Sequence, residues 1–490
     1  MAPSRSGNAP AGNIARQKHK ETPTMPRPST PLSAALPPLI MGTATFNNQY
    51  NHDPFALPTT ELVQRAFTSG IRAFDTSPYY GPAEELLGRA LATDYVRTQH
   101  PRSSYHILTK VGRIASSSFD YSPAWVRQSV RRSLQRLHTD YLDVVYCHDV
   151  EFVSRQEALA AIRELRRIRD TEGTIKYVGI SGFPIDVLAE IAELVLRETG
   201  EPLDIVQSYA NYTLQNTRLL SRGLPRFVGA GVDVVTNASP LGMGLLRRQG
   251  VPIGSMGDFH PAPDGLRNKI REVSDWVDGQ GEKLEVVAIR FSLESWLREG
   301  KQVGALGAPL AKAGDADPGF ISVASMGTGE RLGVSVMGVS NFEELDETLR
   351  VWHSIVDGLE NKDEDEDVEP KSSELQPPSA VPSAAQAPAI LTPSEGIITD
   401  RAWSKDRRGR ISSLAQHIRT ILGPEWADYA WDSPSPDFVN SLSAEHLAAR
   451  DKDAAAAATC ANDESMVTPP LEAVDAAEKI PTAAALDVVL

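Results

Sequence analysis

The sequence is poor in cysteine, in long apolar runs and in basic charge. Its 490 residues include two cysteines, Cys147 and Cys460, which are too few for a disulfide framework and fit a reducing compartment. No apolar run is long enough to cross a bilayer, so we expect a cytoplasmic protein without a membrane partner. The formal net charge of −15 argues against a nucleic-acid partner, because such a partner requires a basic face.

The acidic residues are concentrated at the C-terminal end. Residues 357–490 hold 25 acidic and 11 basic side chains, whereas residues 1–38 hold five basic side chains and one acidic side chain. The central part is therefore close to neutral for its length. The total charge says little about the substrate of that central part.

Residues 1–37 are predicted to be an extension. A basic, acid-poor N-terminus has two interpretations, a mitochondrial transit segment or a disordered tail. Eight prolines by position 38 disfavour the continuous amphipathic helix of a transit segment and favour the disordered tail.

Residues 38–357 alternate short apolar runs with helical periodicity, as at 61–67, 122–137, 156–169 and 185–198. Apolar runs that are each followed by a helix indicate a parallel sheet. Eight runs favour a closed (β/α)₈ TIM barrel over an open doubly wound sheet, and no G-x-G-x-x-G follows the first run. The predicted strands are Met41–Phe46, Ala73–Thr76, His106–Val111, Leu142–Cys147, Tyr177–Ser181, Asp204–Ser208, Val232–Thr236 and Val334–Val339.

The remaining stretches are predicted from composition. Residues 297–332 are glycine-rich and are interpreted as an inserted loop before the eighth strand. Residues 358–399 form an acidic, then Pro/Ala/Ser-rich linker. Residues 400–437 regain helical spacing with aromatic residues behind it, which predicts a helix and an aromatic segment that pack on the barrel. Residues 438–490 are predicted to be a largely disordered tail.

Four reactive side chains follow three neighbouring predicted strands. Asp75 and Tyr80 follow the second strand, Lys110 ends the third and His148 ends the fourth. Each alone has a structural interpretation, but working residues of a (β/α)₈ barrel lie at the carboxyl ends of strands. An ammonium beside a phenol lowers the phenol's pKa, a carboxylate holds that ammonium, and an imidazole can orient a reacting oxygen. These groups can move a proton but cannot carry a hydride, which requires a cofactor.

The motifs resemble those of the aldo-keto reductase superfamily, and most closely its branch of fungal D-arabinose 1-dehydrogenases and plant L-galactose dehydrogenases. The resemblance implies a catalytic tetrad at Asp75, Tyr80, Lys110 and His148, in which the five-residue spacing from Asp75 selects Tyr80 over Tyr79. The motifs are GTATFN, FDTSPYYG, LTKVG, YLDVVYCHD, KYVGISGFP and NASPLGMGLL.

The resemblance also implies a nicotinamide cofactor across the barrel mouth. Ser181 and Gln207 would hold the carboxamide, although the usual Asn beside the serine is Gly182 here. The residue that usually stacks on the nicotinamide falls at Ala238. The other implied cofactor contacts are Gly42 and Thr43, then the pyrophosphate loop Ser239, Pro240, Leu241 and Gly242, and at the adenosine end Gly338, Ser340 and Glu344.

Residues at the adenosine end favour NAD over NADP. Relatives that use NADP place a basic residue at the position of Ser340, and no Lys or Arg occurs between Gly338 and Leu349. Glu344 would repel a 2′-phosphate but can accept a hydrogen bond from a free ribose hydroxyl. An alternative interpretation is that Glu344 belongs only to the acidic first turn of a helix.

The branch resemblance implies oxidation of an aldose at C1 to an aldono-1,4-lactone, with a small sugar as the partner. The alternatives are an NADPH-dependent reductase of aldehydes, ketones or pyridoxal, and a non-catalytic redox-sensing subunit. No metal site is expected, since His260, His417 and His446 have no other metal-ligand residues at suitable spacing in the sequence. Cys147 and His148 are neighbours on one strand, so they point to opposite faces and cannot share a metal. The sequence leaves monomer and homodimer open.

Overall fold

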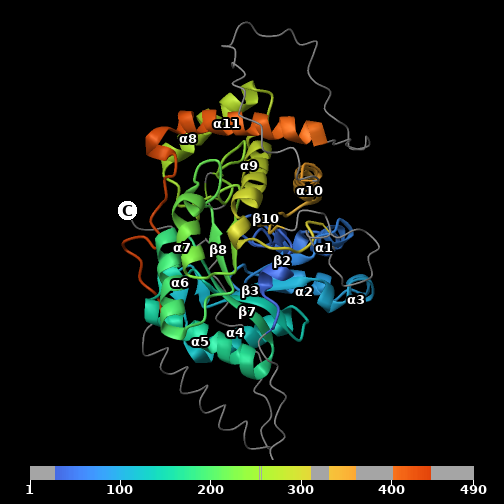
Figure 1. The fold of residues 1–490 in the computed structure, drawn as a ribbon, viewed down its shortest axis with the longest axis vertical. Helices are drawn as coiled ribbons and strands as arrows, with labels where there is room; N and C mark the ends of the chain where they lie inside the picture. The colour runs from blue at the N-terminus through green and yellow to red at the C-terminus, as the bar shows by residue number, and fades with distance from the viewer. Residues whose placement is uncertain (1–27, 253, 255–256, 311–329, 360–400, 443–490) are drawn as a thin grey trace, which may run out of the picture.

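Eight parallel strands close into a barrel in the computed structural model, which describes residues 28–252, 254, 257–310, 330–359 and 401–442. The predicted (β/α)₈ fold is confirmed, and the strands follow the order β1-β10-β9-β8-β7-β6-β3-β2 around the barrel (Figure 1). Their bounds are β1 Leu39–Gly42, β2 Ala73–Asp75, β3 His106–Val111, β6 Leu142–His148, β7 Ile175–Gly182, β8 Ile205–Tyr209, β9 Val234–Ala238 and β10 Val334–Gly338.

Helices surround the barrel because each carries one apolar face. The capping box at Ser154 and Glu157 starts α5, and Ser122 with Pro123 starts α4. A two-stranded hairpin, β4 Arg113–Ala115 and β5 Ser118–Phe119, follows β3. The helices are α1 Thr59–Thr68, α2 Ala83–Leu91, α3 Asp94–Gln99, α4 Pro123–Arg136, α5 Arg155–Glu172, α6 Ile185–Thr199, α7 Leu224–Gly229, α8 Asp264–Gly279, α9 Leu284–Glu299, α10 Phe342–Asp357 and α11 Arg401–Trp426.

Several predicted boundaries differ from the structure, among them those of the first strand and of the insertion before the eighth strand. The first strand is predicted at Met41–Phe46, but β1 ends at Gly42. The chain turns there, because Thr43 N donates to Asp75 O and Phe46 N donates to Thr43 O. The glycine-rich insertion is predicted from Leu297, but α9 continues to Glu299. Residues 311–329 of that insertion lie outside the described part of the chain.

The N-terminal end of the barrel is closed by residues that the sequence assigns to the extension. Leu32 and Leu36 are buried and pack in one cluster with the barrel interior. Tyr177 Oη donates to Thr30 O at 2.8 Å and ties this segment to β7. The ordered fold therefore begins before residue 38. The predicted disorder of residues 1–27, 360–399 and 443–490 concerns positions outside the described residues.

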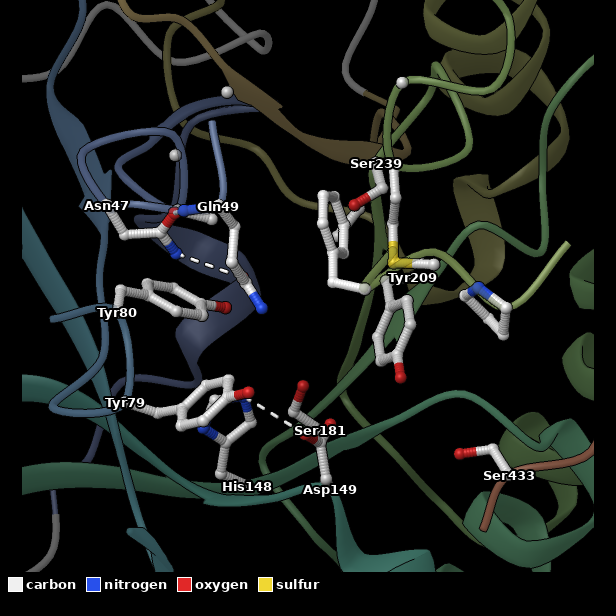
Figure 2. A pocket seen from close by; sticks show the side chains of 18 of the residues that line it. Asn47, Gln49, Tyr79, Tyr80, His148, Asp149, Ser181, Tyr209, Ser239 and Ser433 are labelled. Carbon is white, nitrogen blue, oxygen red and sulfur yellow. Dashed lines mark hydrogen bonds and ion pairs between the residues drawn. The ribbon is translucent and has the colours of Figure 1, made fainter. Parts of the chain in front are cut away.

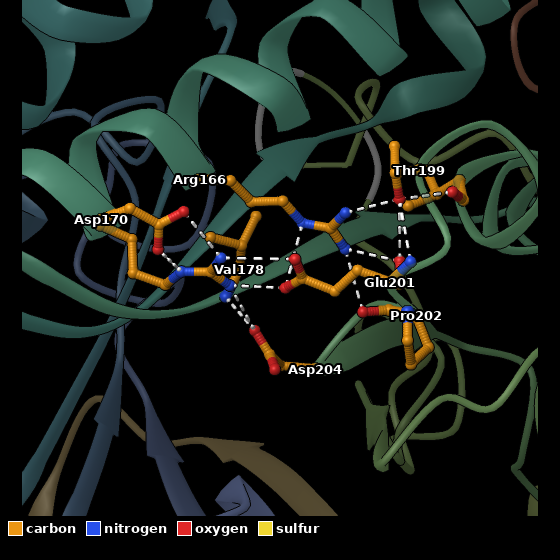
Figure 3. Close-up of polar contacts among 9 residues, drawn as sticks. Arg166, Asp170, Val178, Thr199, Glu201, Pro202 and Asp204 are labelled. Carbon is orange, nitrogen blue, oxygen red and sulfur yellow. Dashed lines mark hydrogen bonds and ion pairs between the residues drawn. The ribbon is translucent and has the colours of Figure 1, made fainter. Parts of the chain in front are cut away.

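An ion-pair network fixes the entry to β8 (Figure 3). Arg169 of α5 pairs with Glu201 at 2.7 Å, and Arg166 donates to the backbone carbonyl oxygens of Glu201 and Pro202. Asp204 accepts from Val178 N at 2.9 Å. This network anchors the loop before β8 to α5 and β7, so it sets the register that carries Gln207 to the barrel mouth.

The segment after residue 400 packs on the side of the barrel. Helix α11 lies along α8 and α9 (Figure 1), and Ile411, Leu414 and Ile418 are buried in that interface. The buried Arg290 of α9 holds α10 and α11 together through Ser354 and Ser404. Beyond Trp426 the chain continues over the barrel mouth, which places its aromatic residues at the site described next.

Candidate active site

A cavity of about 450 Å³ opens at the carboxyl ends of the barrel strands. Its lining comes from loops far apart in the chain, including the C-terminal segment. Most of the predicted catalytic and cofactor-binding residues line this cavity. Five of them lie outside the lining, namely Lys110, Thr43, Gly242, Ser340 and Glu344. Those that line it are Gly42, Asp75, Tyr80, His148, Ser181, Gln207, Ser239, Pro240, Leu241 and Gly338.

Strand register brings the polar groups to one level. His148 of β6 pairs in register with Ser181 of β7, and Ser181 pairs with Gln207 of β8. Lys110 of β3 lies behind them and pairs with Tyr146. Side chains at the ends of adjacent parallel strands lie side by side, so His148, Ser181 and Gln207 become direct neighbours although 33 and 26 positions separate them in the sequence.

Lys110 and Asp75 form a buried ion pair. Lys110 Nζ lies 2.7 Å from Asp75 Oδ1, with side-chain exposures of 1% and 3%, and it also donates to Thr76 O at 2.9 Å. Burial raises the pKa of Asp75 while the Lys110 ammonium opposes that rise. Neither charge has water to stabilise it, so each depends on the other.

Tyr80 and His148 face each other across the cavity floor. Their ring centroids lie 5.6 Å apart at an interplanar angle of 89°, and Figure 2 shows the Tyr80 hydroxyl directed into the cavity. Lys110 Nζ lies 4.9 Å from the centroid of the Tyr80 ring. His148 is fixed from behind, because its Nδ1 hydrogen-bonds Ser77 Oγ at 3.0 Å and Tyr121 Oη donates to its carbonyl oxygen.

The pKa of Tyr80 differs in direction from the sequence expectation. The sequence predicts that Lys110 lowers it, but burial and then the carboxylates of Asp75 and Asp149 raise it well above its usual value. The physical reason is that burial disfavours the phenolate, and the opposing charge of Lys110 is already matched by Asp75. Tyr80 is therefore protonated at neutral pH in the structure described here.

His148 is a neutral hydrogen-bonding group. Burial lowers its pKa to about 3, although Asp149 opposes the shift. A neutral imidazole can donate or accept a hydrogen bond at the cavity surface but holds no exchangeable positive charge near neutral pH. It is thus suited to orient an oxygen atom beside Tyr80.

The cavity has the features that a nicotinamide dinucleotide needs. Ser181 and Gln207 line it, and among the described residues Gln207 Oε1 is buried without a hydrogen-bond partner, so a carboxamide N–H would satisfy it. Gly42 and Gly338 at the cavity wall are needed for packing, since a Cβ at these positions would lie 3.2 Å from Val336 Cγ1 and 3.1 Å from Thr45 Cγ2. The residues present therefore fit this cofactor.

Two residues occupy the space left by departures from the family pattern. A Cβ at Gly182 would lie 2.3 Å from Glu151 Oε2, so the Glu151 carboxyl fills the place of the usual Asn side chain. Burial raises the pKa of Glu151 to about 8. Tyr209 lines the cavity and pairs in register with Ala238, so an aromatic ring lies next to the small residue. Sequence inspection missed both, because neither is adjacent to the position it complements.

The loop after β9 turns tightly at the rim of the cavity. Ser239 and Gly242 have φ values of 56° and 57°, and Gly242 N donates to Ser239 O at 2.8 Å. His260 Nε2 lies 2.8 Å from the Gly242 carbonyl oxygen. The turn closes on itself, because the N–H groups of Gly242, Gly244, Leu245 and Leu246 all donate to backbone carbonyl oxygens within it.

A basic residue lies near the predicted adenosine end after all. Glu344 Oε2 accepts hydrogen bonds from Ser340 N at 2.8 Å and Ser340 Oγ at 3.0 Å. Its other oxygen lies 3.5 Å from Arg247 Nη2, and Arg247 lines the cavity. The sequence contains no basic residue between 338 and 349, but the fold brings Arg247 to Glu344 from 97 positions away. The signal for it in the sequence is the pair Arg247–Arg248, which directly follows the motif NASPLGMGLL.

The C-terminal segment forms one wall of the cavity. Trp431 stacks on Phe183, with ring centroids 4.5 Å apart and an angle of 4°, and Phe438 packs edge-on against Phe152 at 4.8 Å. Ser433 Oγ donates to Glu151 Oε1 at 3.1 Å. The aromatic residues after α11 were predicted to pack on the barrel, but their place in the cavity was not foreseen.

Within the described ranges, no group of three or more His, Cys, Asp or Glu side chains is arranged to hold a metal ion. His417 stacks on Trp276 at 4.2 Å, and His446 lies outside the described residues. In the same part of the chain, every helix is too short or too polar to traverse a bilayer.

Comparisons with known proteins agree with the motifs. The profile of the aldo/keto reductase family matches residues 38–361. The chain is 43% identical to D-arabinose 1-dehydrogenase from Saccharomyces cerevisiae over 272 residues, covering 55% of this chain and 79% of that protein. It is 33% identical to L-galactose dehydrogenase from Arabidopsis thaliana over 297 residues, covering 60% of this chain and 86% of that protein. It is 27% identical to D-threo-aldose 1-dehydrogenase from a Pseudomonas species, covering 55% of this chain and 85% of that protein.

Proposed function

The chain belongs to the aldo/keto reductase family, and from this premise we propose that it oxidises an aldose at C1 to an aldono-1,4-lactone with NAD⁺. Family membership makes it an oxidoreductase that acts on CH–OH groups with NAD(P)H. The observation that carries the proposal is the convergence of Asp75, Tyr80, Lys110 and His148 at one barrel mouth. The sugar preference is inferred from relatives named as aldose dehydrogenases.

In the proposed reaction Tyr80 receives the proton of the C1 hydroxyl. His148, held by Ser77 at 3.0 Å, donates a hydrogen bond to that oxygen and orients it toward Tyr80. NAD⁺, bound through Ser181 and Gln207, would supply the acceptor for the hydride that leaves C1 and a positive charge in the cavity. Lys110, anchored by Asp75, would stabilise the Tyr80 phenolate that accepts this proton, although burial and the nearby carboxylates outweigh it and raise the pKa of Tyr80.

Protonation of Tyr80 sets the direction that neutral pH favours. Because its pKa lies well above the usual value, the phenol is ready to donate a proton, which serves reduction, whereas oxidation requires the phenolate. Oxidation by this site should therefore accelerate as pH rises.

NAD is the proposed cofactor because Glu344 occupies the predicted adenosine end. Its carboxylate accepts from Ser340 N and Oγ and would repel a 2′-phosphate. One observation favours a second candidate, an NADPH-dependent reductase, namely Arg247 at 3.5 Å from Glu344, since an arginine can pair with a phosphate. A kcat/KM with NADP above that with NAD would overturn the first choice.

The test is an assay of NADH or NADPH formation with D-arabinose, L-galactose, L-fucose and simple aldehydes, using both cofactors. The proposal expects oxidation of at least one aldose with NAD⁺. Reduction of aldehydes by NADPH without sugar oxidation would support the second candidate. Cofactor binding without any turnover would support a non-catalytic redox-sensing role.

A further inference from the structure

A second set of polar side chains borders the cavity beside the tetrad. It consists of Arg113, Asp149 and Tyr79, which all line the cavity. Figure 2 shows Tyr79 and Asp149 next to His148. None of the three is used in the proton transfer described above, yet burial of charged groups has a cost that needs a physical reason.

Arg113 is positioned by the hairpin that follows β3. Gly112 has a φ of +100°, and a Cβ there would lie 2.3 Å from Tyr121 Cε2, so only glycine lets the chain turn toward the cavity at this point. The guanidinium carbon of Arg113 then lies 3.8 Å from the centroid of the Tyr79 ring. Arg113 Nη2 donates to Tyr79 Oη at 2.9 Å, and Nη1 pairs with Asp149 Oδ2.

Asp149 is presented by an unusual backbone conformation. It follows His148 directly and has φ 55° and ψ 61°, the left-handed region that Asp and Asn tolerate better than other side chains. Its carboxylate is 2% exposed, and Oδ2 lies 3.6 Å from His148 Nε2. Within the described part of the chain, Oδ1 is buried and has no hydrogen-bond partner, so a substrate hydroxyl that reaches it would satisfy it.

The chemistry of this set selects a particular neighbour of the reacting carbon. In a cyclic aldose, C1 is bonded to the ring oxygen, which can only accept hydrogen bonds, and to C2, which carries a hydroxyl that can donate. A carboxylate next to His148 can therefore pair with the C2 hydroxyl but not with the ring oxygen. The aromatic side chains of Phe152, Trp431 and Phe438 also line the cavity and suit the apolar face of the same sugar.

Resting on the proposed function, we infer that Asp149, held in place by Arg113, binds the C2 hydroxyl of the sugar and makes the site select hydroxylated substrates. A simple aldehyde has no hydroxyl group that could donate a hydrogen bond to this carboxylate, so the buried charge stays without a hydroxyl partner when such a substrate binds. Sites built to hydrogen-bond a substrate hydroxyl discriminate strongly against analogues without it. Asp149 is thus a specificity-determining residue next to the tetrad.

The experiment compares the aldose that the protein oxidises fastest with its 2-deoxy analogue. The unsubstituted protein should prefer the hydroxylated sugar in kcat/KM by roughly 10- to 100-fold, the range expected for a hydrogen bond to a charged group. In Asp149→Asn, which suits the same backbone conformation, that preference should shrink by at least about tenfold. Cofactor binding, followed by NADH fluorescence, should be unchanged. The control is Asp437→Asn, an exposed carboxylate outside the cavity lining, which should keep the preference.

Two results would overturn the inference. One is an equal loss of kcat/KM for both sugars in Asp149→Asn, which indicates a structural role. The other is no preference for the 2-hydroxyl in the unsubstituted protein, a result that needs no variant. If no sugar is oxidised at all, the proposed function fails separately, and calorimetric binding of the two sugars to the NADH complex decides the subsite: tighter binding of the hydroxylated sugar supports it, and equal or absent binding contradicts it.

Discussion

Replacement of Lys110 by methionine tests how the buried ion pair supports the site. Lys110 Nζ and Asp75 Oδ1 are 2.7 Å apart with side-chain exposures of 1% and 3%, so the variant leaves a carboxylate without its partner or water. Removing one partner of such a pair costs about 3–5 kcal/mol. Asp75, whose pKa burial already raises, would then take up a proton more readily, which limits that cost.

The double variant Lys110→Met/Asp75→Asn separates charge from catalysis. It removes both buried charges, so it should regain at least about half of the free energy of unfolding that the single variant loses, while turnover stays lost in both. The loss in Lys110→Met should also be smaller at about pH 5 than at about pH 8, because a carboxyl group with a raised pKa stabilises the fold at low pH and loses this contribution as pH rises.

Urea unfolding followed by tryptophan fluorescence measures these differences. Equal stability of Lys110→Met and the unsubstituted protein would refute the reasoning, as would a double variant that is less stable than the single one. Full activity in either variant would refute the catalytic assignment of Lys110.

Three further predictions concern pH and chain connectivity. Glu151→Gln keeps an acceptor for Ser433 but removes a buried carboxyl whose pKa is raised to about 8. Because the ionised carboxyl destabilises the fold at high pH, the variant should raise Tm relative to the unsubstituted protein more at about pH 8.5 than at about pH 5. Equal Tm shifts at the two pH values would contradict this. Sugar oxidation should accelerate with rising pH because Tyr80 must lose its proton before it can accept one from the sugar. His148, with a pKa of about 3, should add no transition to the pH profile above about pH 5. A kcat that stays constant from about pH 6 to about pH 9 would contradict this. Replacement of residues 361–399 by a Gly/Ser linker of about eight residues should leave kcat and Tm nearly unchanged. A short linker is long enough because the residues on either side lie close together: a Cβ at Gly358 would lie 2.5 Å from Ser404 Oγ. A large loss in kcat or Tm would show that the replaced residues contribute.

The fold could be predicted from local pattern because each barrel strand is an apolar run with a helix behind it. The same pattern places Asp75, Lys110 and His148 at strand ends, and parallel strands bring such ends together without further information. The family match at residues 38–361 confirms the resemblance drawn from the motifs. The catalytic roles of these residues stay predictions that the variants above test.

Long-range contacts could not be predicted from the sequence. Trp431 meets Phe183 across 248 positions, and nothing local to either residue indicates the other. Glu344 pairs with Arg247, which lies outside residues 338–349, where the sequence analysis looks for a basic residue. Leu32 closes the barrel end although it lies in a proline-rich stretch, because burial depends on what the fold brings to it.

The predicted direction of the Tyr80 pKa shift is wrong for a physical reason. The sequence shows an ammonium, Lys110, in the same site as the phenol and therefore predicts a lowered pKa. It pairs Asp75 with this ammonium, as the structure does at 2.7 Å, but it shows neither the burial of the phenol nor Asp149 as a second negative charge nearby. Net charge around a buried group depends on all its neighbours, and a single partner seen in the sequence fixes neither the sign nor the size of the shift.

Turnover of Tyr80→Phe tests the central claim most directly. The variant keeps the ring that faces His148 and Lys110 but removes the hydroxyl, so aldose oxidation should fall by roughly 10²- to 10⁴-fold while NADH binding stays within about twofold of the unsubstituted protein. Tyr95→Phe, which removes an exposed hydroxyl, is the matched control and should keep full activity. Aldose oxidation by Tyr80→Phe at a rate close to that of the control would contradict the account.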